Sequence, residues 1–200
     1  MCNVYEKGKE SACSPVFLES EAILELEQHS DRELIRRTDS APVVTQMGEV
    51  KVMRWGFRRK ELGVINNSRS DKLNGSMWER AYQAQRCLIP VKAYFEWKGA
   101  SGQKQSYRFE SPTQERLWMA GLWEESSEFG LCFSMITTVA NRKVLPIHHR
   151  MPAILEGTAQ ERFLQGQEVS FEPSHDSLVY SKCDNPLVRQ KEPPEQRELF

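Results

Sequence analysis

The chain must place much of its backbone in short extended segments, because runs of β-branched and aromatic residues recur throughout its 200 residues. These runs are too short for long helices, and they do not alternate regularly with helices as a parallel sheet requires. The pattern therefore predicts an α+β fold with a predominantly antiparallel, barrel-like mixed β-sheet and a few short helices. The expected strands cover residues 50–57, 86–97, 105–111, 116–125, 131–139, 151–155 and 178–183.

Three segments have the composition of helices. Residues 20–37 carry apolar side chains at an imperfect helical spacing, and we expect this helix to break near His29. Two shorter helices are expected over residues 77–85 and 158–166, the second bounded by a capping threonine and a terminal glycine. Helices are thus minor elements that accompany the sheet.

Composition favours one folded domain. Hydrophobic residues make up 39% of the chain and aromatic residues 10%, which is enough for one sizeable core, while the length is too small for several. The domain is expected to cover residues 1–185, and the polar, proline-bearing residues 186–200 are expected to form a loose tail. A net charge of -1 excludes a strongly basic nucleic-acid binder but allows a local basic patch.

No apolar run approaches the roughly 20 residues that span a bilayer, and the first residues lack the pattern of a signal peptide. We therefore expect an intracellular protein without a membrane partner. The cysteines are odd in number and scattered, with no spacing typical of a zinc site, so neither a disulfide framework, a metal nor a cofactor is expected. They are Cys2, Cys13, Cys87, Cys132 and Cys183. Cys87 and Cys132 are expected to be small buried hydrophobic residues.

Cys2 differs from the other cysteines, because removal of Met1 would give it a free α-amine beside its thiol. The amine, with a usual pKa of about 7.7 to 8.0, can attack an aldehyde to form a Schiff base. The thiol can then add to the imine and close a thiazolidine ring without a metal. The alternative is that Cys2 is an arbitrary second residue.

Two polar segments supply further candidates. In residues 65–71, an extended backbone would project Asn67, Arg69 and Asp71 from one face. Glu96 lies between two aromatic residues at the end of an apolar run, a setting that raises the pKa of a carboxyl by desolvation. Such a carboxyl can transfer protons near neutral pH. The alternative for Glu96 is an ordinary position on the exposed face of a half-buried strand.

A third segment combines His148, His149 and Arg150 before a strand-like run. Histidine is suited to acid-base chemistry at neutral pH, and the neighbouring arginine favours an anionic ligand such as phosphate. The segment therefore indicates a polyanionic substrate. Trp55, which precedes a glycine, is either a stacking platform for a base or a core residue.

Taken in order, these motifs resemble the SRAP domain, the family of SOS-response-associated peptidases. The resemblance rests on MC at the start, MRWGF, NxR within NNSRSD, RCLIPVKAYFEWK, and ITTVAN followed by IHHRMPAIL. It runs from Cys2 to about Asn185. It implies that the N-terminal cysteine forms a thiazolidine crosslink with the ring-opened aldehyde of an abasic site in single-stranded DNA. The crosslink would shield the lesion in the DNA damage response.

The resemblance also assigns roles by motif. Cys2 is the nucleophile, Asn67 orients the reacting terminus and the sugar, and Glu96 handles protons during Schiff-base formation and cyclisation. His148 assists ring opening of the sugar and the reverse reaction. The residues expected to contact DNA, with the two arginines on phosphates, are Arg69, Arg150, Trp55 and Met151. Phosphate contacts carry no sequence information, so binding is expected to be salt-sensitive and sequence-independent.

The sequence departs from the usual family pattern at several positions. The family usually begins MCGR, whereas this chain has Asn3 and Val4 after the cysteine. Asp71 replaces the usual glutamate, residues 41–44 lack the usual polar residues after proline, and His149 stands where an acidic residue is common. These departures indicate a divergent member with an altered DNA-facing surface.

Two other functions fit the same residues. In a cysteine-type peptidase or autopeptidase, Cys2 would attack an acyl carbon with His148 as its base. In a non-covalent module, the chain would bind single-stranded DNA after its chemistry had decayed. For a bacterial or phage protein, we expect a cytoplasmic, nucleoid-associated location.

Overall fold

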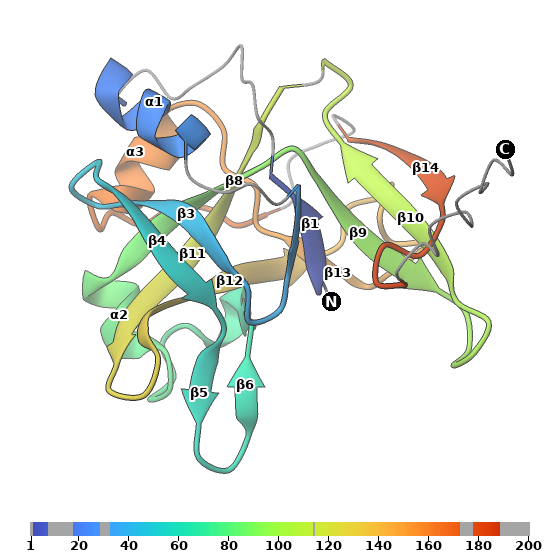
Figure 1. The fold of residues 1–200 in the computed structure, drawn as a ribbon, viewed down its shortest axis with the longest axis horizontal. Coiled ribbons are helices and arrows are strands. Elements are labelled where there is room, and N and C mark those ends of the chain that lie inside the picture. The colour runs from blue at the N-terminus through green and yellow to red at the C-terminus, as the bar shows by residue number, and fades with distance from the viewer. Residues whose placement is uncertain (1, 8–17, 29–32, 114, 173–177, 189–200) are drawn as a thin grey trace, which may run out of the picture.

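The computed structural model describes residues 2–7, 18–28, 33–113, 115–172 and 178–188 (Figure 1). Met1, Cys13, His29 and most of the expected C-terminal tail lie outside these ranges. Among the described residues, no helix has the length and apolar character needed to cross a membrane.

Five strands form a closed barrel, which agrees with the barrel-like mixed sheet expected from the sequence. They follow the order β11-β8-β3-β4-β12, and β12 pairs back with β11 to close the ring. All neighbours are antiparallel except β12 and β4, which are parallel. The barrel strands are β3 (Ser40–Thr45), β4 (Val50–Trp55), β8 (Arg86–Val91), β11 (Leu117–Ser126) and β12 (Gly130–Val139).

A second, antiparallel sheet lies beside the barrel, in the order β14-β10-β9-β1-β2 (Figure 1). Its central strand β9 continues directly from barrel strand β8, so a single segment belongs to both sheets. The members of this sheet are β1 (Val4–Glu6), β2 (Leu34–Arg36), β9 (Ala93–Lys98), β10 (Gln105–Glu110) and β14 (Val179–Cys183).

Smaller elements complete the fold. Strands β7 (Asn67–Arg69) and β13 (Arg150–Pro152) pair with β12, and β5 (Phe57–Arg59) pairs with β6 (Gly63–Ile65) in a separate hairpin. A 3-10 helix, η1, follows β7. The helices are η1 (Ser70–Lys72), α1 (Ser20–Gln28), α2 (Glu79–Ala84) and α3 (Thr158–Leu164).

The alternation of side chains along each strand divides the apolar residues into two clusters. In β8, Cys87 and Ile89 belong to the cluster inside the barrel, whereas Leu88 belongs to the cluster that packs with α2 and α3. Side chains alternate between the two faces of a strand, so both faces of the barrel wall are apolar and covered. The interior is tight at Gly121, where an added Cβ would lie 2.9 Å from Cys87 Sγ. Cys132 is fully buried like Cys87, as expected.

Two expected strands are each divided in the structure. Residues 50–57 break at Gly56, whose φ of 131° favours glycine and whose Cβ would lie 2.4 Å from Val64 Cγ1. Residues 86–97 break at Lys92, where the chain leaves the barrel for the second sheet. The expectation of one continuous strand was wrong in both places, because strand-forming residues continue through a change of sheet.

The expectation of a helix over residues 20–37 was wrong at its C-terminal end. The helix α1 ends at Gln28, and residues 34–36 form β2, which pairs with β1. The short apolar pattern of these residues fits either a strand or a helix, and pairing with β1 decides between them. The expected extended conformation of residues 65–71 ends at Arg69, so Asp71 lies in η1.

Candidate functional site

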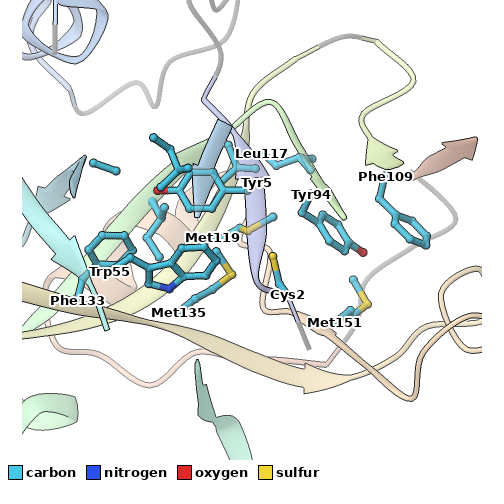
Figure 2. Packing of buried hydrophobic residues seen from close by; sticks show 14 of the residues in the cluster. Cys2, Tyr5, Trp55, Tyr94, Phe109, Leu117, Met119, Phe133, Met135 and Met151 are labelled. Carbon is cyan, nitrogen blue, oxygen red and sulfur yellow. The ribbon is translucent and has the colours of Figure 1, made fainter. Parts of the chain in front are cut away.

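Cys2 lies directly before β1 and is fully buried. Its side chain belongs to the apolar cluster that fills the barrel and extends to the second sheet, and Figure 2 shows it among Met119, Tyr94 and Met151. The thiol donates a hydrogen bond to the backbone carbonyl of Val4 at 3.3 Å. The beginning of the described chain thus enters the protein core instead of extending into solvent.

Two side-chain amides hold the backbone carbonyl of Cys2. Asn67 Nδ2 donates to this oxygen at 2.8 Å, and Asn66 Nδ2 donates to it at 3.1 Å. We call these two amides the clamp. Asn66 Nδ2 also lies 3.3 Å from Asn3 Oδ1, so the asparagine after the cysteine contacts the clamp as well. A carbonyl fixed by two donors leaves the preceding α-nitrogen little freedom to change direction.

Asn67 brings a second polar atom to the site. Its Oδ1 is buried and has no hydrogen-bond partner among the described residues. A buried acceptor without a partner is costly and therefore indicates a position where a ligand or solvent group can donate. An ammonium group or a sugar hydroxyl would satisfy it.

Glu96 lies on β9 and is only 1% exposed. Burial raises the pKa of its carboxyl to about 7, so the desolvation expected from the sequence is present. Burial also raises the pKa of the Cys2 thiol, and the nearby Glu96 carboxylate raises it further. The site therefore combines a neutral thiol with a carboxyl that titrates near neutral pH.

Trp55 and Met151 are core residues in this structure. Trp55 has no exposed surface, and its indole packs against Tyr5 and stacks with Phe133 at centroid distances of 5.1 and 6.2 Å. It therefore offers no open face to a base, and the core alternative for this residue holds. Trp55 Nε1 donates to the backbone carbonyl of Asn66 at 2.8 Å, and this hydrogen bond helps to fix the backbone of Asn66. Met151 is likewise buried, so neither residue has an exposed surface for DNA.

His148 and His149 form a stacked pair with their ring centroids 4.5 Å apart. His148 Nδ1 lies 3.0 Å from the backbone nitrogen of Arg150 and 2.9 Å from its carbonyl oxygen. Partial burial lowers the pKa of His148, which favours a neutral ring at pH 7. Because Nδ1 contacts the main chain, proton exchange with a substrate would use Nε2. His149 is exposed.

Arg69 and Arg150 both contact Asp71. Arg69 makes a bidentate pair with this carboxylate at 3.1 and 2.7 Å, and these hydrogen bonds lower the pKa of Asp71 to about 2. Arg150 Nη1 lies 3.3 Å from Asp71 Oδ1, and Nη2 donates to the backbone carbonyl of Thr137. Arg150 is only 5% exposed, whereas Arg69 is exposed. Arg69 is therefore the better placed of the two to meet a phosphate.

The structure joins three of the four expected catalytic residues through direct contacts or electrostatic interaction, namely Cys2, Asn67 and Glu96. His148 lies in the loop before β13, where it contacts the main chain of Arg150, and Arg69 and Arg150 meet at Asp71. Within the described part of the chain, no group of three His, Cys, Asp or Glu side chains is arranged to hold a metal ion.

The family model of the SOS response associated peptidase (SRAP) matches residues 5–188. The chain belongs to the SRAP family. Its closed barrel and three short α-helices agree with the fold expected from the sequence resemblance.

Among curated SRAP relatives, the Saccharomyces cerevisiae abasic site processing protein YMR114C is 30% identical over 117 residues, which are 54% of this chain and 32% of that protein. The Gallus gallus abasic site processing protein HMCES is 28% identical over 200 residues, covering 82% of this chain and 54% of that protein. The Bacillus subtilis abasic site processing protein YoqW is 27% identical, over 56% of this chain and 55% of that protein. The chain thus spans about a third to about half of the length of these relatives.

Solved structures share the SRAP fold at low sequence identity. A protein from Bordetella bronchiseptica superimposes with a TM-score of 0.75 at 20% identity, covering 92% of this chain and all of that chain. A protein from Bacteroides thetaiotaomicron gives a TM-score of 0.71 at 21% identity, covering 92% and 93%. These likenesses establish the architecture alone.

The sequence reasoning missed Asn66 and the contact of Asn3 with it in this SRAP chain. An alternating pattern assigned only Asn67 and the odd-numbered residues after it to the site. Asn66 precedes β7, where the regular alternation has not begun, so its amide can reach the same carbonyl as its neighbour. Two consecutive asparagines at the start of a short strand were the available signal.

Proposed function

We propose that this protein captures abasic sites in single-stranded DNA covalently through Cys2, by forming a thiazolidine. The observation that carries the proposal is the fixed carbonyl of Cys2 beside a buried carboxyl whose pKa is about 7. Membership of the SRAP family and the names of the relatives, which are abasic site processing proteins, support the choice of lesion.

The first step needs the α-amine of Cys2, which removal of Met1 would release. The amine adds to the C1′ aldehyde of the ring-opened sugar, and the carbinolamine loses water to give a Schiff base. Protonation of the leaving hydroxyl requires an acid near neutral pH, and Glu96 has the appropriate pKa. The unpartnered Oδ1 of Asn67 is suited to accept a hydrogen bond from the ammonium or the sugar.

The second step is the addition of the Cys2 thiol to the imine carbon. A carbon–sulfur bond forms, the imine electron pair moves to nitrogen, and the S–H proton is transferred to that nitrogen. Because burial raises the pKa of the thiol, the sulfur does not ionise unaided, and the Glu96 carboxylate is suited to carry the proton. The net change is the loss of one water molecule, without a metal or a cofactor.

The same thiol environment disfavours a cysteine peptidase. A peptidase nucleophile attacks as a thiolate, which requires a depressed pKa. The pKa of Cys2 is instead raised, chiefly by burial. An aminothiol can react with an aldehyde through its amine first, so a neutral thiol is compatible with ring closure.

The test is incubation of the Met-processed protein, verified by intact mass, with a single-stranded oligonucleotide that contains one abasic site. A heat-stable crosslink on a denaturing gel is expected for the parent and for the control Cys183→Ser, and no crosslink for Cys2→Ala. Cys2→Ser should give at most a linkage that hydrolyses on heating, because oxygen is the weaker nucleophile. Peptide cleavage without crosslinking would favour the peptidase, and a salt-sensitive gel shift that survives Cys2→Ala without a crosslink would favour the non-covalent module.

A further inference from the structure

A row of three side chains crosses the second sheet from the candidate site to the edge strand. Glu96 on β9 is directly opposite Tyr107 on β10, and Tyr107 is directly opposite Lys182 on β14. Directly opposed residues in an antiparallel sheet share one face. Exposure increases along the row, from the buried carboxyl through a half-buried ring to an exposed ammonium group. The row therefore leads outward from the reacting groups to solvent.

An aromatic row runs beside it on the same face. Tyr94, Phe109 and Tyr180 are directly opposed on β9, β10 and β14. The rings of Tyr94 and Phe109 stack at 4.9 Å, and the ring of Tyr180 lies 5.4 Å from Phe109 and 5.9 Å from Tyr107. Two rings therefore contact Tyr180 within the sheet. Its side chain is still 46% exposed, so part of its surface is open to solvent.

These rows are continuous with the candidate site. Tyr94 and Phe109 belong to the same apolar cluster as Cys2, and Figure 2 shows Tyr94 nearest the cysteine, with Phe109 beyond it and the next strand of the sheet beyond Phe109. Figure 1 shows β14 at the margin of the molecule, next to β10. The two rows therefore connect the candidate site with the β10–β14 face of the same sheet.

Positive charge accompanies the exposed end of the rows. Lys182 ends one row, and Lys98 lies two residues beyond Glu96 on the same face of β9. Lys104 precedes β10 and is close enough to Glu96 to act on its carboxyl electrostatically. An exposed aromatic ring with a lysine two residues away on the same face of its strand is a combination that binds single-stranded nucleic acid, through base stacking and phosphate contacts.

We propose that Tyr180, supported by Tyr107 and Phe109, stacks on the base of an intact nucleotide next to the abasic residue, while Lys182 contacts its phosphate. This inference rests on the proposed function and extends it from the lesion to the flanking nucleotide. Every base has a face that can stack, so the contact tolerates any sequence and still requires a base. The predicted substrate is thus an abasic residue with at least one base-bearing neighbour.

The test uses a single-stranded oligonucleotide with 2-aminopurine next to a tetrahydrofuran abasic analogue, which has no aldehyde and forms no crosslink. The parent and Tyr180→Phe should quench 2-aminopurine fluorescence on binding. Tyr180→Ala should lose the quenching and raise the Kd about tenfold, the effect of one lost stack. Lys182→Ala should keep the quenching and reduce the slope of log affinity against log salt by about 0.7. Val179→Ala, on the opposite face of the same strand and 41% exposed, is the control.

The assay contains no covalent step, so its result is independent of the crosslinking test. Because the tetrahydrofuran analogue cannot form a crosslink, quenching by the parent and its loss in Tyr180→Ala would support the stacking site even if no crosslink ever formed. Quenching that persists in Tyr180→Ala, or an equal loss of affinity in Tyr180→Ala and Val179→Ala, would overturn the inference. If Cys2 forms the crosslink and either of these results is found, the proposed function holds and only the stacking inference fails.

Discussion

Replacing Glu96 with glutamine removes a carboxyl that the folded protein holds in an apolar environment. Burial raises the pKa of this group from its usual 4.5 to about 7. At about 1.4 kcal/mol for each pH unit, the difference corresponds to about 3 kcal/mol between folded and unfolded protein. Between about pH 4.5 and 7 the folded state retains a proton that the unfolded state has lost. The contribution of Glu96 to the free energy of unfolding therefore falls through this range and levels off above it.

The glutamine variant has no proton to lose at this position, so the fall should be absent from it. We expect the stability of Glu96→Gln relative to the parent to increase by about 3 kcal/mol from pH 4.5 to pH 8. Urea unfolding at several pH values, followed by tryptophan fluorescence, measures this difference. Other titrating groups contribute equally to both proteins and cancel. Glu49→Gln, at an exposed position, controls for the loss of one negative charge.

A stability difference that stays constant across this pH range would refute the assignment of a buried, high-pKa carboxyl to Glu96. The same variant also shows whether Glu96 acts in proton transfer or in DNA binding. Its crosslinking rate should be low, and the change in rate near pH 7 that the ionisation of Glu96 gives the parent should be absent. Its affinity for single-stranded DNA should remain near that of the parent, because the role proposed for Glu96 is proton transfer.

Three further outcomes follow from contacts described above. Asn66→Ala should slow single-turnover crosslinking about fivefold at unchanged DNA affinity, since the Cys2 carbonyl loses one of two donors; an equal loss of affinity would instead mark a DNA contact. Arg69→Ala should weaken binding to all single-stranded sequences and reduce the salt slope by about 0.7, and an unchanged slope in a titration would exclude a phosphate contact. Gly121→Ala should reduce the free energy of unfolding by about 1 to 3 kcal/mol in urea, because its Cβ would meet Cys87; a variant as stable as the parent would show room in the barrel.

The sequence predicts four of the five barrel strands, because strand-forming residues recur along β4, β8, β11 and β12, but it misses β3 at Ser40–Thr45. It fails where tertiary contacts decide the outcome. Nothing in the strand-like residues around Lys92 marks the passage from one sheet to another, since both halves have the same local preference for extended backbone. Residues 34–36 are equally ambiguous, and only their pairing with β1 makes them a strand.

The candidate site shows the same division. Cys2 and Glu96 can be proposed from chemistry and motif, because an aminothiol and a desolvated carboxyl are recognisable in sequence. The clamp formed by Asn66 requires the fold, since it joins residues more than sixty positions apart. The burial of Arg150 and Trp55 is also a tertiary property, because the sequence alone does not show whether an arginine or a tryptophan lies in the core or on a DNA-facing surface.

Strand β1 has only three residues, and two of them pair with β9. Because Cys2 directly precedes this short strand and is fully buried, we expect local detachment of the strand to admit the lesion to the sulfur in the proposed reaction. The frequency of that detachment would then set an upper limit on the capture rate, however tightly the DNA is held. Amide hydrogen exchange at Tyr5 would measure this limit directly, and substitutions that strengthen the pairing of β1 would make a more stable but slower protein.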